Sequence, residues 1–199
     1  MHIRAPAILL AARHTGETAV VAQLLTEDFG LVAAYIAGGR GRQMRPVVIP
    51  GNRVEMQLTD KSGSGLPFAK LELLESRGPW LGEPLAAAAI GWVTALSARA
   101  LPERQPFPAL YEALGGLLDA ICHAPSARGW AGALVGYEVL LLRELGYGAN
   151  IRPEGDLPAI IAAMDRLTSP MDHYLLAELR GDVMAARHRL RELLGRIDT

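Results

Sequence analysis

Arginine is the only charged residue type between Asp28 and Glu55, and this stretch is the part of the chain best suited to binding an anion. Three of the arginines belong to a glycine-rich loop at residues 37–45, and one follows a Pro-Gly-Asn turn. The four are Arg40, Arg42, Arg45 and Arg53. Guanidinium groups donate paired hydrogen bonds to phosphate oxygens. The loop therefore predicts a surface that binds a polyanion, with a solvated, flexible surface loop as the ordinary alternative.

The residue types that usually catalyse reactions or bind metals are scattered. The five histidines have no metal-binding spacing; they are His2, His14, His123, His173 and His188. Cys122 and His123 are adjacent, so on a helix they point in different directions, and we expect a small buried thiol and a helix C-terminal charge. One cysteine forms neither an internal disulfide nor a thiolate zinc site. We predict a protein that is not an enzyme and has no metal or cofactor; a hydrolase with an unmarked site is a remote alternative.

The charge is distributed unevenly along the chain. Its net charge is -1, yet residues 1–78 hold nine Lys and Arg against seven Asp and Glu, while residues 79–199 hold eleven against fourteen. Any contact with a polyanion is therefore a local patch on the N-terminal part. The apolar run at residues 5–12 is too short for a secretion signal, and the uncharged stretch at residues 84–98 is shorter than the roughly 20 residues of a membrane span. We predict a cytoplasmic, nucleoid-associated protein without a membrane contact.

Short apolar or alternating segments predict five strands in the N-terminal part. They cover residues 7–13, 18–26, 30–36, 53–58 and 68–73, and turns rich in Gly, Pro, Asn and Asp separate them. Five short strands in about 75 residues favour a small closed barrel of the OB type. The fold class we predict is α+β, with an OB-fold barrel at residues 1–78 and an all-α domain at residues 79–199.

Helical periodicity begins after residue 78. Helices are predicted from Pro84 to residue 100, at residues 109–123, at 126–145 with Ser126 as the cap, and from residue 156 or 157 to 167. Ser169-Pro170 should punctuate the chain before one or two further helices at residues 171–195, and residues 102–108 read as a proline-rich linker. The third helix is apolar almost all round from Leu134 onward, so we expect it at the centre of the helical domain.

An OB barrel that carries arginines suggests contacts with a single strand, in which cations meet phosphates and aromatic faces meet bases. The expected DNA-binding residues are Arg13, Tyr35, Arg40, Arg42, Arg45, Arg53 and Lys70. Phe29 and Phe68 are expected in the core, so phosphate contacts should dominate and binding should depend on salt with little sequence preference. A second basic contact is a weaker expectation at Arg187, Arg189 and Arg191; the solvated face of a helix is the alternative.

The order of several motifs resembles the RecO family of bacterial recombination mediators. The first strands resemble that family at residues 11–13, 16–18 and 24–30, followed by the loop Gly38-Gly39-Arg40 and by Ile49-Pro50-Gly51. The helical hallmark of the family, aromatic-Glu-x-x-Leu-Leu-x-x-Leu-Gly-Tyr-Gly, is present at residues 137–148. Together these motifs cover most of residues 7–152.

The resemblance implies an OB fold followed by a helical domain, single-stranded DNA binding and strand annealing, with duplex DNA as a further expectation. It also implies contact with the acidic tail of single-stranded DNA-binding protein, partnership with RecR and an indirect role in loading RecA. The sequence departs from the family in three ways, one of which is a chain shorter than usual beyond the Gly-Tyr-Gly segment. Residues 150–154 lack the cysteines of a zinc module, so we predict no zinc, and Val135-Gly136 replace basic residues found before the aromatic-Glu pair. The rival hypothesis is a non-catalytic adaptor whose barrel binds protein partners.

Overall fold

A computed structural model describes residues 2–60, 65–148, 150–176 and 183–197. The chain divides into two compact units. The first contains Met1–Gly82 together with Leu101–Tyr111, and the second contains Glu83–Ala100 and Glu112–Thr199. None of the helices that the structure describes combines the length and the apolar character needed to span a membrane.

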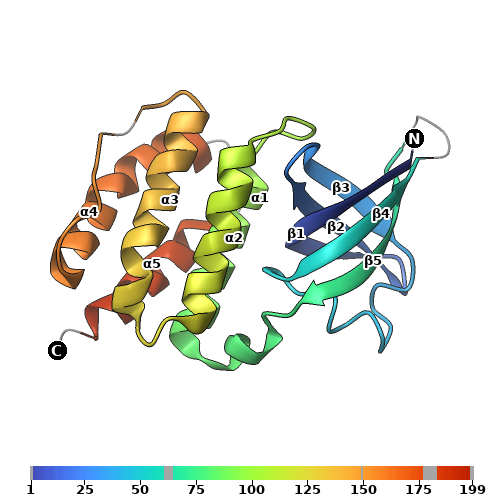
Figure 1. The fold of residues 1–199 in the computed structure, drawn as a ribbon, viewed down its shortest axis with the longest axis horizontal. Coiled ribbons are helices and arrows are strands. Elements are labelled where there is room, and N and C mark those ends of the chain that lie inside the picture. The colour runs from blue at the N-terminus through green and yellow to red at the C-terminus, as the bar shows by residue number, and fades with distance from the viewer. Residues whose placement is uncertain (1, 61–64, 149, 177–182, 198–199) are drawn as a thin grey trace. The chain divides into compact units, whose positions relative to one another are not determined.

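Five strands of the first unit close into a barrel (Figure 1), which confirms the predicted fold class. They are β1 (His2–Thr15), β2 (Ala19–Thr26), β3 (Gly30–Ile36), β4 (Arg53–Thr59) and β5 (Phe68–Glu75). Their order around the barrel is β1-β2-β3-β5-β4, with β3 and β5 parallel and the other pairs antiparallel. Closure leaves no free sheet edge, which explains why such short strands are stable.

The first strand is twice as long as predicted because its two halves pair with different strands. His2 to Ile8 pair with β4, and Ala7 to Thr15 pair with β2, with a register shift between Leu9 and Ala11. A shift of this kind bends a strand and increases its twist. The bend lets one strand serve both sides of the barrel, and the inward side chains of all five strands form the buried core.

The glycine-arginine segment between β3 and β4 is more regular than the flexible loop we expected. Consecutive turns order its backbone, with hydrogen bonds from Gly41 N to Gly38 O (2.8 Å), Arg45 N to Gly41 O (3.0 Å) and Val48 N to Met44 O (2.8 Å). Glycine is required twice. Gly38 has a φ of +65°, and a Cβ on the buried Gly39 would lie 2.5 Å from Val20 Cγ2.

The proline-rich segment that we read as a linker packs beside the barrel. Arg104 N donates to Leu31 O (2.9 Å). Gly30 has a φ of +67°, and a Cβ there would lie 2.1 Å from Gln105 O, so no other residue fits this close approach. The compact barrel unit therefore includes Leu101–Tyr111, whereas a domain boundary after residue 78 stays a prediction.

Helices make up most of the second unit. They are α1 (Pro84–Ala100), α2 (Pro108–His123) from Glu112 onward, the 3-10 turn η2 (Ala127–Gly129), α3 (Ala131–Glu144), α4 (Leu157–Pro170), the π-helix η3 (Met171–Leu176) and α5 (Val183–Gly195). A further 3-10 turn, η1 (Gly78–Gly82), lies in the first unit. Within the second unit α1 packs against α5 and α3 against α4. Eight residues of α3 are buried, as expected of a central helix.

The helix ends follow the sequence signals with two exceptions. Asp156 caps α4 by accepting a hydrogen bond from Ala159 N (3.1 Å), and Gly146 with a φ of +86° ends α3. Ser126 makes no side-chain capping bond, and a 3-10 turn precedes α3, so the helix predicted from Ser126 begins at Ala131. The fourth helix ends at Pro170, three residues later than predicted, but Pro170 does not interrupt the helical run. The chain continues directly into the π-helix at Met171.

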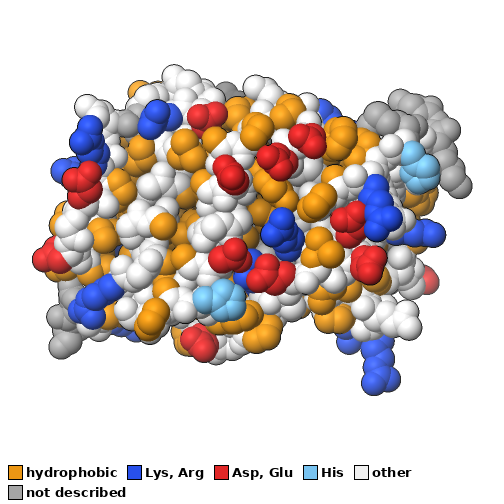
Figure 2. Space-filling view, viewed as in Figure 1, with side chains coloured by type: hydrophobic (Ala, Val, Ile, Leu, Met, Phe, Trp, Pro, Cys, Tyr) orange, Lys and Arg blue, Asp and Glu red, His pale blue; other side chains and the backbone are white. Residues whose placement is uncertain are grey.

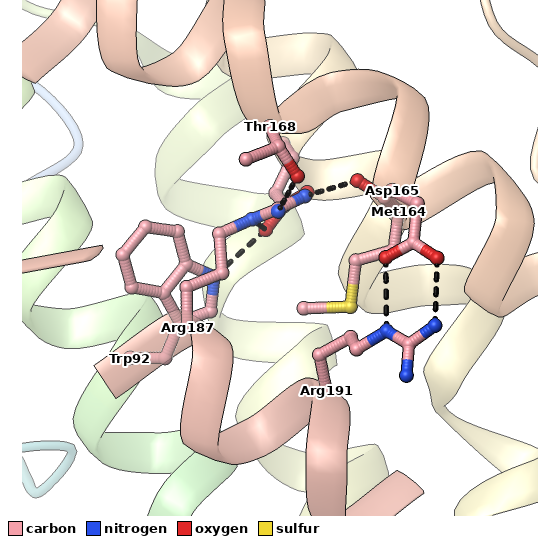
Figure 3. Close-up of polar contacts among 7 residues, drawn as sticks. Trp92, Met164, Asp165, Thr168, Arg187 and Arg191 are labelled. Atoms are coloured by element: carbon pink, nitrogen blue, oxygen red, sulfur yellow. Dashed lines mark hydrogen bonds and ion pairs between the residues drawn. The ribbon is translucent and has the colours of Figure 1, made fainter. Parts of the chain in front are cut away.

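A buried ion pair joins four helices of the second unit. Glu138 on α3 accepts from Arg187 Nε (2.9 Å) and Nη2 (2.7 Å) on α5, and from Trp92 Nε1 (2.8 Å) on α1. Arg187 also donates to Thr168 Oγ1 (2.9 Å) and to Met164 O (2.7 Å) on α4. In Figure 3 its guanidinium lies between Trp92 and Thr168, in the middle of these contacts.

Candidate nucleic-acid interface

Strand register brings four side chains into one row on the outer face of the barrel. Arg13 of β1 pairs with Val21 of β2, Val21 pairs with Tyr35 of β3, and Tyr35 pairs with Phe68 of β5. Neighbouring strands lie about 4.8 Å apart, so the row from Arg13 to Phe68 spans about 14 Å. Ala22, Ala34 and Ala69, next to these positions, face the core, and alternation therefore turns the row outward.

Two aromatic rings stand together at one end of this row. The Tyr35 and Phe68 ring centroids are 5.1 Å apart with an interplanar angle of 69°, an edge-to-face arrangement. Phe68 is 51% exposed, so its expected place in the core is wrong; Phe29 is partly buried against the core as expected. The alternation of Phe68 with Lys70 already indicated the outward face, since Ala69 and Leu71 are the inward pair.

The loop arginines lie at the same end of the barrel as Arg13. Arg40 N donates to Thr18 O (3.0 Å) and its guanidinium to Glu17 O (2.9 Å), which ties the loop to the turn between β1 and β2. Arg45 Nε donates to Arg40 O (3.2 Å). Figure 2 shows Lys and Arg side chains projecting where Figure 1 places the segment between β3 and β4. These contacts hold Arg40 and Arg45 at the end of the barrel where β1 turns into β2, and Arg42 lies between them in the sequence.

A cavity of about 370 Å³ lies between two of these loop arginines and the C-terminal end of β1. Arg40, Arg45 and His14 line it together with Gly39 and Pro50. A cavity bordered by two guanidinium groups and an imidazole suits a phosphate group, since each of these side chains donates hydrogen bonds.

The cations of this region are not neutralised by acids. Arg13, Arg40, Arg42, Arg45 and Lys70 are exposed, and none of them forms an ion pair with any residue that the structure describes. The hydrogen bonds of Arg40 and Arg45 go to backbone carbonyls, which leave the formal positive charge in place. The region therefore keeps a positive potential that attracts polyanions.

Arg53 is the member of the predicted set that lies elsewhere. It pairs with Glu75 and Ile8, at the opposite end of β4 from Thr59 and Phe68. There its guanidinium shares a hydrogen bond with the Tyr111 hydroxyl; burial raises the pKa of that hydroxyl, and Arg53 partly offsets the rise. Sequence spacing suggested one arginine cluster, but the length of β4 places Arg53 at the far end, and we leave it out of the site.

The second basic contact is wrong for Arg187, which is 1% exposed and bonded to Glu138. Arg191 is half-exposed and forms two hydrogen bonds with Asp165 (2.9 and 2.8 Å). Those hydrogen bonds lower the pKa of the Asp165 carboxyl and raise that of Arg191, so the pair stays charged and mutually neutralised. Arg189 is exposed and stays a prediction.

The described residues of the chain contain no set of side chains suited to binding a metal ion. No group of three or more His, Cys, Asp or Glu side chains lies close enough there to hold an ion. Cys122 is buried in the helical unit, as expected for a small apolar side chain.

Two family models match the chain. Residues 1–77 match the model described as recombination protein O N terminal, and residues 81–154 match that described as recombination protein O C terminal. The first model covers the strands of the barrel, and the second covers the helical segment that contains Trp92 and Glu138.

Several curated proteins named DNA repair protein RecO are similar to this chain. That of Rhodospirillum centenum is 42% identical over 145 residues, which are 72% of this chain and 56% of that protein. That of Ruegeria sp. is 38% identical over 152 residues, covering 76% and 62%, and that of Caulobacter vibrioides is 38% identical over 146 residues, covering 73% and 59%. The chain thus spans little more than half the length of these relatives.

Proposed function

The chain belongs to the RecO family, and from this premise we propose that it is a non-enzymatic mediator of DNA repair and homologous recombination. It binds single-stranded DNA on the barrel and anneals complementary strands. One observation carries the proposal: the outward row from Arg13 to Phe68 shares the barrel with three loop arginines. Neither Arg13 nor the loop arginines form an ion pair with an acidic residue that the structure describes. Such DNA lies at the bacterial nucleoid, which is where we propose the protein acts.

The proposed mechanism is electrostatic. Arg13, Arg40, Arg42, Arg45 and Lys70 contact backbone phosphates and release condensed counterions. Neutralising phosphates on two strands lowers their mutual repulsion and keeps them close enough to pair. Annealing in this manner breaks no covalent bond, so it needs neither a nucleophile nor a metal. Duplex DNA carries the same phosphates, and we expect it to bind the same cations.

The partners that we propose are those of the family, and we expect them to bind to the helical unit. They are the acidic tail of single-stranded DNA-binding protein and RecR, with RecA loaded indirectly onto strands that the first of these had coated. A non-catalytic adaptor with a protein-binding barrel is the second candidate, because β5 also exposes Leu74, which is 52% exposed. The two candidates differ in whether the isolated protein binds DNA.

A salt titration of binding to single-stranded DNA tests the proposal. The logarithm of the affinity falls with the logarithm of salt by about 0.7 for each phosphate contact on a single strand. Replacing Arg40, Arg42 and Arg45 with alanine should therefore weaken binding and reduce the slope by about two units. Fluorescence anisotropy of a labelled oligonucleotide measures both quantities.

Two matched controls separate local contacts from total charge. Arg53→Ala removes an exposed arginine of the same barrel at its other end, and it should leave the slope unchanged. Replacing Arg99, Arg152 and Arg166 removes the same three charges from exposed positions of the helical unit, with little expected effect on the slope. Equal slopes in the loop variant and the wild type reject the site, and a wild type that does not bind DNA favours the adaptor.

A further inference from the structure

A second and larger cavity opens at the strand end where β3 stops and β5 begins. Its volume is about 760 Å³, within the range of pockets that hold small molecules. Ile36, Met44 and Leu71 supply apolar lining, and Phe68 borders it with half of its surface exposed. Residues 37–48 contribute to both cavities, since Ala37 and Met44 line this one and Arg40 and Arg45 line the smaller one. An apolar recess therefore lies on the other side of the segment that carries the arginines.

The Tyr35 ring contacts the Phe68 ring, and strand pairing on both sides of β5 holds the Phe68 backbone in place. The two rings meet edge to face at 5.1 Å, and Tyr35 N donates to Pro67 O (2.8 Å), which ties β3 to the residue before Phe68. Thr59 pairs with Phe68 from β4. A ring that is fixed before a ligand arrives loses little conformational freedom on binding, so an exposed face of Phe68 is a prepared stacking surface.

Polar groups that both donate and accept hydrogen bonds border the same cavity. Gln57 contributes an amide and Thr59 a hydroxyl, and Lys70 contributes a cation next to Phe68 along β5. The imidazole of His2 is oriented by contacts of its Nδ1 with Leu58 O (3.0 Å) and Thr59 Oγ1 (3.3 Å). An aromatic face, donors, acceptors and one cation match the face, the edge and the phosphate of a nucleotide.

We propose that this cavity receives one unstacked base of a DNA strand, with Phe68 as the stacking surface and Lys70 on the adjoining phosphate. The inference rests on the proposed function and deepens it. The arginines contact phosphates, which single strands and duplexes share, whereas the cavity takes a base that a duplex keeps paired and stacked. Base capture should therefore favour single strands over duplexes, whereas phosphate contacts should supply most of the affinity for both.

Two oligonucleotides of equal length test this assignment, one of thymidine and one of abasic deoxyribose-phosphate units. The wild-type protein should bind the thymidine strand about tenfold more tightly, because stacking on one aromatic ring contributes about that factor. Phe68→Ala should abolish this difference while leaving the affinity for the abasic strand and the salt slope unchanged. Phe68→Trp should retain it, which separates loss of the aromatic face from misfolding.

Leu74→Ala is the matched control, since Leu74 is an exposed apolar residue of β5 outside the cavity lining. It should keep the wild-type preference. Equal wild-type affinities for the two strands, with a normal salt slope, overturn base capture and leave the proposed function standing. Equal losses on both strands in Phe68→Ala also overturn it, because the residue would then support the fold or the phosphate contacts. Failure of the wild type to bind either strand rejects both proposals.

Discussion

At the scale of single residues, Arg187 and Glu138 show that burial gives two charged side chains a structural role inside the helical unit. Arg187 belongs to a basic run, yet it is 1% exposed and uses three nitrogens on Glu138, Thr168 and Met164. Glu138 is fully buried and also accepts from Trp92. The glutamate of the aromatic-Glu motif therefore joins helices, and its burial keeps it from contacting a partner at the surface of the unit.

Arg187→Met should lower the free energy of unfolding of the helical unit by about 3–5 kcal/mol, because it leaves the Glu138 carboxylate buried without its cation. Urea unfolding followed by far-UV circular dichroism measures this loss. The double variant Glu138→Leu with Arg187→Met should lose less than the sum of the two single variants, since it leaves no unpaired charge. Arg189→Met, at an exposed site on the same helix, should change stability by less than about 0.5 kcal/mol. Additive losses would contradict this account of the pair.

At the scale of elements, the segment between β3 and β4 positions the cations by contacts of its backbone. Gly39 is buried against Val20, and the neighbouring Arg40 bonds to Thr18 and Glu17 in the turn between β1 and β2. The segment therefore follows the barrel wall, and the direction of its arginines depends on that close approach. From the sequence, the Gly38-Gly39 pair suggested flexibility. In the structure, Gly39 allows the backbone of this segment to approach Val20 closely.

Gly39→Ala should destabilise the barrel by about 1–3 kcal/mol and weaken binding to single-stranded DNA, because the added methyl group would meet Val20 and displace Arg40. Thermal unfolding and anisotropy measure the two effects. Gly82→Ala is the control, since a Cβ at Gly82 meets nothing within 4 Å. Wild-type stability and affinity in Gly39→Ala would show that the segment tolerates a wider separation from the barrel.

At the scale of the whole molecule, the two units carry charges of opposite sign. A molecule with a net charge of -1 repels DNA weakly overall, so the DNA binding that we propose depends on the local potential of the barrel cations. The helical unit is more acidic, and the Asp165–Arg191 pair neutralises part of its basic run. This distribution of charge supports the proposal that DNA binds to the barrel and that partners bind to the helices.

Hydrogen exchange of the whole protein with and without single-stranded DNA tests this division. Protection should appear at residues 13–18 and 37–48, where the bound strand covers backbone amides beside the arginines. The amides of α1, α3 and α4 should exchange at the same rate in both conditions. Protection confined to α5 would assign binding to Arg189 and its neighbours and contradict the barrel site.

Local sequence pattern by itself determined the elements of this protein and the presence of an arginine loop. Short apolar runs predicted the first three strands and alternation the last two, Pro84 and Asp156 marked helix starts, and Gly146 marked a helix end, because each signal acts within a few residues. Tertiary structure alone decided which side chains meet. Strand pairing brings Tyr35 and Phe68 together, and the length of β4 separates Arg53 from them. Arg187 is buried in the helical unit, where it is bonded to Glu138. Strand register and the burial of single side chains depend on residues that are tens of positions away in the sequence. The local hydrophobic pattern therefore does not predict them.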